Sequence, residues 1–179
     1  MTKKKFDEYV AKQSSETRES EIDSSKKRDE WLEYVNKFYK KVGSFLQEYV
    51  SGGQIKIVYG SKKISEEYIG EYEVSTAIIH LGKNQVRLDP IGTNLIGAKG
   101  RVDMIGQNGK VKFVLVDKNA SAPRTSVQVW VQGEEPPPKA DKPMKIDWVW
   151  KISTPPPRIK YIEFNSESFF DAFMEVANG

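Results

Sequence analysis

The sequence predicts an α+β fold: an antiparallel sheet of seven to eight strands, open or strongly curled, flanked by one N-terminal and one C-terminal amphipathic helix. Two observations carry this prediction. Apolar residues recur with a helical period near each end of the chain, and for about a hundred residues after Gly53 they alternate with the period of strands. Links of hairpin length between the strands indicate antiparallel neighbours, with the helices segregated from the sheet.

The chain is expected to divide into a flexible N-terminal arm, residues 1–26, and a single α+β domain, residues 27–179. The arm has one small apolar cluster, formed by Phe6, Tyr9 and Val10, and is otherwise polar. Such low hydrophobicity does not offset the entropy of ordering a segment. The alternative is that these three side chains form a short docking helix.

Residues 27–50 show the pattern of one amphipathic helix, which Ser51 and the two glycines after it end. The apolar stripe steps by three or four residues and consists of Trp31, Val35, Phe38, Val42, Phe45 and Tyr49. We expect this stripe to pack on the sheet, because most helix stability comes from such packing. The alternative is a homodimer in which the helix of residues 31–49 forms a coiled-coil seam.

The first predicted strands cover residues 54–59, 71–81 and 85–89, and Gly82 begins a tight hairpin between the last two. Pro90 is expected to end the third strand, because proline has no amide proton for the ladder.

A strand over residues 95–105 follows, and the Asn108-Gly109 step predicts a hairpin to residues 110–117. Residues 110–117 have apolar side chains on both faces of the predicted strand, which is typical of a central strand covered from both sides.

Residues 125–132 and 144–152 alternate as further strands, separated by an exposed proline-rich loop at 133–143. The row of Ile146, Trp148 and Trp150 is expected to meet the helix aromatics, so Trp148→Ala should lower stability. A strand over residues 158–164 precedes a C-terminal helix, which Asn165 caps.

Composition excludes several functions. The chain has no cysteine, which rules out disulfides, thiolate metal sites and cysteine nucleophiles. Its net charge of +3 gives no strong attraction to polyanions. Acidic residues interrupt the basic N-terminus before any apolar run, and no window reaches the length of a membrane span, so a cytoplasmic protein without membrane contact is expected.

No complete catalytic set or metal site is readable, and no cofactor is expected. The glycine-rich segment at residues 92–101 lacks the helix that a phosphate-binding loop or a KH-type Gly-x-x-Gly clamp requires, so its glycines are better explained by a bend. His80 is the one histidine of the chain and is expected to be a strand residue. Four aspartates stand in or at the ends of strands, where a pair can converge for acid–base or magnesium chemistry, although such residues usually serve turns: Asp89, Asp103, Asp117 and Asp147.

One candidate binding surface combines basic and aromatic residues: Lys99, Arg101, Lys110, Lys112 and Trp130. Together with the glycine-rich loop it predicts, as an alternative function, binding of single-stranded nucleic acid on the sheet face. The leading prediction is a non-enzymatic binding or accessory protein that contacts another protein, since no catalytic set is complete. A small-ligand carrier or enzyme with a pocket between sheet and helices is the further alternative.

Overall fold

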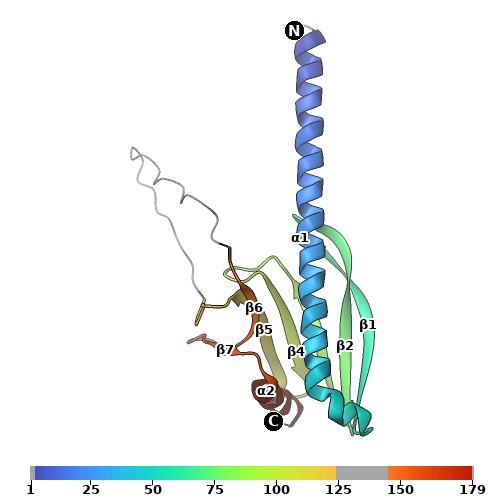
Figure 1. Ribbon diagram of the computed structural model, residues 1–179, viewed down its shortest axis with the longest axis vertical. Helices are drawn as coiled ribbons and strands as arrows, with labels where there is room; N and C mark the ends of the chain where they lie inside the picture. Colours follow the sequence, from blue (N-terminus) through green and yellow to red (C-terminus); the bar gives the residue numbers. More distant parts are fainter. Residues whose placement is uncertain (1–2, 124–144, 179) are drawn as a thin grey trace.

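The computed structural model describes residues 3–123 and 145–178 and contains one open, seven-stranded antiparallel sheet with the strands in sequence order. This confirms the predicted α+β class. The predicted strand at 125–132 and the proline-rich loop at 133–143 lie outside the described residues. The elements are α1 (Lys3–Ser51), β1 (Ile55–Glu66), β2 (Gly70–Leu81), β3 (Asn84–Gly92), β4 (Gly100–Gly106), β5 (Gly109–Asp117), β6 (Trp148–Ser153), β7 (Tyr161–Glu163) and α2 (Ser166–Asn178) (Figure 1).

Helix α1 is 49 residues long and begins at Lys3, not near residue 27 as the sequence pattern predicted. Its first half projects beyond the sheet as a rod (Figure 1). The chain has no glycine or proline before Gly43, so a helix anchored at residues 31–46 can propagate outward one residue at a time without a new nucleus. Ion pairs one turn apart support it, at 3.8 Å for Lys12–Glu16 and 2.8 Å for Asp23–Lys27. That the arm moves independently of the domain stays a prediction.

The aromatic stripe of α1 packs on the chain's own sheet, as predicted. Phe38 is fully buried, and its ring centroid lies 5.2 Å from that of Phe113, 5.1 Å from Trp150 and 5.3 Å from Phe164. Trp31, Val35 and Val42 of the stripe are also buried, as is the neighbouring Leu46, whereas Tyr49 is 42% exposed. The buried side chains therefore pack within the chain, and a homodimer through the helix of residues 31–49 stays a prediction.

Helix α2 packs on the same side of the sheet, against β3, β4 and β5. Asn165 caps it as predicted: the Ser168 amide donates to Asn165 Oδ1 at 2.9 Å, and the Asn165 amide donates to Ser168 Oγ at 3.1 Å. Phe169 and Phe173 are buried and extend the aromatic core. Both helices thus cover one face of the sheet, called the inner face below.

The β1–β2 hairpin leaves the sheet part of the way along its length. Pairing between β2 and β3 ends at Ala77 and Leu88, and the Tyr39 hydroxyl lies there, 2.9 Å from the Ser75 carbonyl oxygen and 3.3 Å from that of Leu88. Burial, more than the nearby Asp89, raises the pKa of Tyr39.

The free end of this hairpin is held by Glu66. Its carboxylate accepts hydrogen bonds from the Tyr72 hydroxyl, from the Thr93 amide and hydroxyl, both at 2.9 Å, and from the Asn94 amide at 2.8 Å. Burial and this bond together raise the pKa of Tyr72. The turn between β1 and β2 is thereby fixed to the segment that leads into β4.

Two strand boundaries differ from the prediction. Pro90 does not end β3, which continues to Gly92 and pairs Pro90 with Val102 of β4. At that point β3 has already parted from β2, so the missing proline amide costs no ladder bond. Strand β4 begins only at Gly100, where a Cβ atom would come within 2.2 Å of the Trp31 ring.

Strand β5 is central and covered on both faces, as predicted. It lies between β4 and β6, and residues of both alternations are buried in its second half: Phe113, Val114, Leu115 and Val116. The turn before it consists of Gln107 and Asn108, because Gly106 pairs directly with Gly109, whose φ is +139°.

We predict that Trp150→Ala lowers the free energy of unfolding by about 3 to 5 kcal/mol, the usual loss for a large buried aromatic. Trp150 is 9% exposed, and its indole Nε1 donates to the Tyr34 carbonyl oxygen at 3.1 Å. Trp148 is only half-buried, so Trp148→Ala, the change singled out from the sequence, should cost less. Urea unfolding of both variants measures the difference, and an equal loss would contradict this assignment.

Candidate functional site

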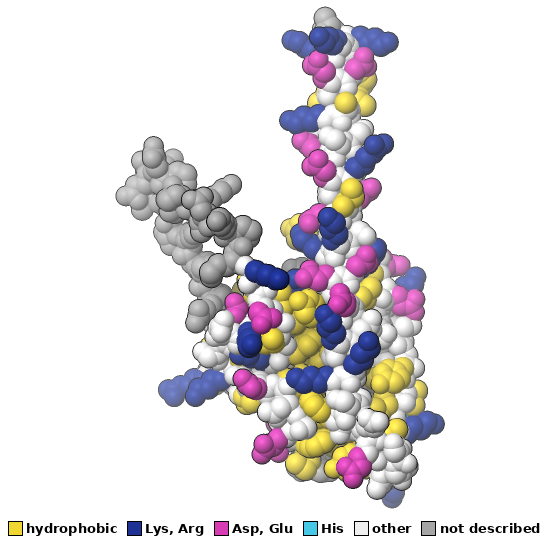
Figure 2. All heavy atoms as spheres, in the orientation of Figure 1, with side chains coloured by type: hydrophobic (Ala, Val, Ile, Leu, Met, Phe, Trp, Pro, Cys, Tyr) yellow, Lys and Arg dark blue, Asp and Glu magenta, His cyan; other side chains and the backbone are white. Residues whose placement is uncertain are grey.

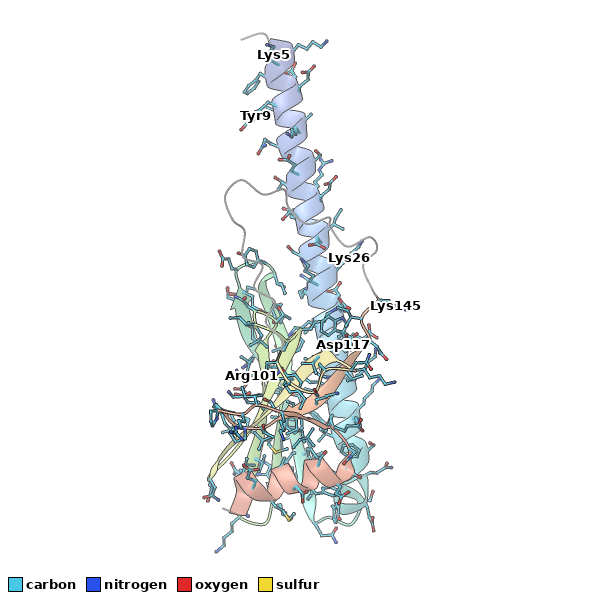
Figure 3. The ribbon with its side chains drawn as sticks, turned by 90° about the vertical axis from the view of Figure 1, so that its left-hand side faces the viewer. Lys5, Tyr9, Lys26, Arg101, Asp117 and Lys145 are labelled. Atoms are coloured by element: carbon cyan, nitrogen blue, oxygen red, sulfur yellow. The ribbon has the colours of Figure 1, made fainter. Side chains whose placement is uncertain are left out.

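Charged side chains gather on the face of the sheet that the helices leave open, called the outer face below. Side chains alternate along strands, so the positions between buried inner-face residues point outward. Figure 3 shows Arg101 on the left of the strands and α1 on their right. The charged outer-face residues of β3, β4 and β5 are Arg87, Asp89, Arg101, Asp103, Lys110 and Lys112.

Asp103 is the centre of this group. It is 2% exposed, and Arg101 holds it with two parallel bonds, Nε to Oδ1 at 2.7 Å and Nη2 to Oδ2 at 2.9 Å. Lys110 Nζ adds a second cation 3.7 Å from Oδ2. A buried carboxylate needs such partners, because an unpaired buried charge is costly.

Asp89 stands directly opposite Asp103 in the pairing of β3 with β4. It receives Lys62 Nζ at 2.6 Å and lies 3.8 Å from Arg87 Nη2. Asp89 and Asp103 therefore lie opposite one another on adjacent strands, but each is paired with two cations.

The other strand-end aspartates serve connections. Asp117 Oδ1 accepts the Asn119 amide at 2.8 Å, a turn role that its position in sequence suggested, and Asp147 lies 3.9 Å from Lys118 Nζ.

The structure brings together Arg101, Lys110 and Lys112 of the predicted binding surface. Lys112 pairs in register with Asp103 and is half-buried, yet it makes no ion pair within residues 3–123 and 145–178. Arg87 and Lys62 extend this basic group, and sequence reasoning missed both. Arg87 was detectable from its alternation with Leu88, whereas Lys62 lies on β1, which is not a neighbour of β3 in the sheet, so no strand register relates it to Asp89.

Lys99 lies elsewhere, on the side of α1. Its Nζ is 2.6 Å from Glu30 Oε1 and 5.0 Å from the centroid of the Trp148 ring. These contacts place the Lys99 ammonium beside α1 and apart from the outer-face cations. Trp130 lies outside the described residues.

His80 is a half-buried strand residue, paired in register with Lys56 and Gln85. In the part of the chain that the structure describes, no group of histidine and acidic side chains could hold a metal ion. Gly92, the last residue of β3, and Gly97, in the loop before β4, have φ of +128° and +79°, as expected for glycines at a bend.

A cavity of about 480 Å³ lies where β5 meets α2, which is the place predicted for a pocket between sheet and helices. Its polar lining includes Lys110, Lys112, Asp171 and Glu175. Sequence reasoning missed Asp171 and Glu175, because no local signal relates α2 to β5.

No family model matches the chain, and no match is found among curated proteins or among solved structures. Among the described residues, no helix has both the length and the apolar character needed to cross a membrane.

We predict that Arg101→Met lowers the free energy of unfolding by about 3 kcal/mol, because it removes both hydrogen bonds of Arg101 and leaves the buried Asp103 carboxylate with the longer ion pair to Lys110. The double variant Arg101→Met with Asp103→Leu removes both charges and should recover most of that loss. Urea denaturation compares the three proteins, and a double variant no more stable than the single one would refute this role of Arg101.

Proposed function

We propose that the protein is a non-enzymatic accessory protein that binds another protein through the projecting part of α1. The carrying observation is that residues 3–23 are exposed throughout while remaining helical. Within the described residues, the first hydrogen bond from α1 to another element is from Ser24 Oγ to the Tyr68 carbonyl oxygen, at 2.8 Å. At 1.5 Å per residue, the free segment extends about 30 Å.

One side of this rod carries no charge. Positions spaced by four and three residues continue the line of the buried stripe toward the N-terminus: Phe6, Val10, Gln13, Thr17, Ser20 and Ser24. Phe6 and Tyr9 are 57% and 61% exposed and, with Val10, form an apolar patch at the tip. Figure 2 shows charges of both signs along the rest of the rod.

An uncharged helical line with an apolar end is typical of a helix that docks in a groove. Charged residues of both signs flank the line, including Lys3, Lys5, Asp7, Glu16 and Glu21. The partner that fits is therefore a protein with an apolar groove and a charged rim. A cytoplasmic location belongs to this proposal, in keeping with a chain that has no cysteine.

The test begins with a photo-crosslinking residue at Tyr9 of the full chain, which should yield one discrete adduct in cells of the source organism. The same residue at Tyr68, which is 71% exposed, is the matched control. The purified partner should then bind the full chain, and Phe6→Ser with Tyr9→Ser and Val10→Ser should weaken binding about tenfold or more.

The melting temperature should stay unchanged, because these three side chains are exposed. Ile96→Ser, at a residue 88% exposed, controls for general surface hydrophobicity and should keep full affinity. Equal affinity of the triple variant, or an adduct formed only with a second copy of the chain, would overturn the proposal.

A second candidate is binding of a single-stranded nucleic acid on the outer face. The observation that favours it is the excess of cations there, where Lys62, Arg87, Arg101, Lys110 and Lys112 surround two aspartates. Because Arg101 is committed to Asp103, Arg87 and Lys112 are the cations best placed to meet phosphates.

Binding of a fluorescent oligothymidine should then weaken steeply with salt, and Arg87→Ala or Lys112→Ala should each reduce the log–log salt slope by about 0.7. Lys99→Ala is the control, since Lys99 lies on the helix side and should leave the slope unchanged. Salt-independent binding, or an equal effect of Lys99→Ala, would exclude this function.

A further inference from the structure

The cavity beside β5 exists because β6 stops before β5 does. Pairing runs from Asp117–Trp148 to Lys112–Ser153, and the same register would place Pro155 opposite Lys110. Pro155 has no amide proton and cannot continue the ladder. The chain instead turns away, and the Thr154 amide donates to the Lys160 carbonyl oxygen at 2.9 Å. Within the described residues, the start of β5 therefore has no strand neighbour on this side.

The backbone of Lys110 faces the vacant position. Gly106 and Gly109 close a hairpin with a two-residue turn, and such a closing pair exchanges its hydrogen bonds across the hairpin. The next residue, Lys110, consequently directs its N–H and C=O away from β4. An extended peptide laid beside β5 would receive one donor and one acceptor from it.

The walls of this groove carry separated charges of opposite sign. Its apolar floor is formed by Val111, Ile152 and Ala172, all buried. On α2, Asp171 and Glu175 stand one turn apart, exposed and without an ion-pair partner among the described residues.

Lys112 lines the closed end of the groove, where Ser153 blocks the way. A strand entering from the open end must terminate at this block. A lysine at that place favours a terminal carboxylate over a terminal ammonium group. The volume of about 480 Å³ lies within the usual range of ligand sites.

We propose that this groove binds the C-terminal tail of a partner protein. The tail adds a short strand beside β5, pairs with the backbone of Lys110 and places its free carboxylate by Lys112. A basic side chain of the tail meets Asp171 and Glu175. The site is separate from the projecting part of α1 and does not depend on it.

The test uses the full chain and fluorescent, N-blocked tetrapeptides that end in valine with a free carboxylate, with arginine placed at each of the first three positions in turn. At least one should bind saturably, and its C-terminal amide should bind about tenfold more weakly. Replacing the arginine of that peptide with glutamate should also weaken binding. Equal affinity for acid and amide, or a Kd above about 1 mM for all peptides, would overturn the proposal.

Variants test which side chains recognise the terminal carboxylate and which recognise the basic side chain of the tail. Lys112→Met should abolish the difference between acid and amide, and Asp171→Asn with Glu175→Gln should abolish the preference for arginine over glutamate. Glu167→Gln, on α2 but outside the groove, should change neither.

The variant with serine at positions 6, 9 and 10 should bind the peptide normally, which separates a failure of this site from a failure of the arm. Loss of peptide binding in that variant, or an unchanged acid preference in Lys112→Met, would contradict the assignment.

Discussion

Burial of the aromatic stripe of α1 against the inner face of the sheet is the contact on which the rest of the structure depends. Phe38 lies at its centre, in contact with rings from β5, β6 and the segment before α2. Burying aromatic side chains of this size contributes on the order of 2 to 3 kcal/mol each. Polar anchors fix the helix along its axis, since Tyr39 bonds to β2 and the carbonyl oxygen of Tyr34 accepts from Trp150. These contacts fix the orientation of α1 on the sheet and so set the direction of its projecting half.

Because both helices occupy one face, the other face must satisfy its own charges, and the composition of β5 changes along the strand accordingly. Its second half is buried on both sides, whereas its start carries Lys110 and Lys112. Asp103, on the neighbouring strand, is buried at this boundary and takes its compensation from Arg101. The basic surface and the groove therefore both lie at the start of β5, where apolar residues no longer cover both faces of the strand.

The apolar periodicity of the sequence predicted the structure correctly where the pattern lies within a single helix or a single hairpin. The spacing of Trp31 and Phe38 predicted both the helix and its buried side, and the predicted hairpin placed Arg101 and Lys112 on adjacent antiparallel strands. The prediction of element boundaries was wrong where contacts with another part of the structure determine them. Pro90 is tolerated because β2 has departed, and the helix reaches back to Lys3 because propagation from an anchored helix needs little hydrophobicity. No periodicity relates Glu175 on α2 to the start of β5.

The two proposed activities of this end of the sheet compete for the same cations. Lys110 lies 3.7 Å from Asp103, which already has two bonds from Arg101, so a ligand can draw the Lys110 ammonium away at little cost. Among the described residues Lys112 has no such partner, and it is the outer-face cation best placed to meet an anion. A peptide carboxylate in the groove would neutralise Lys112 and leave Arg87 as the main contact for a phosphate chain. Binding of a tail and binding of a polyanion should therefore weaken one another, since both use the charge of Lys112.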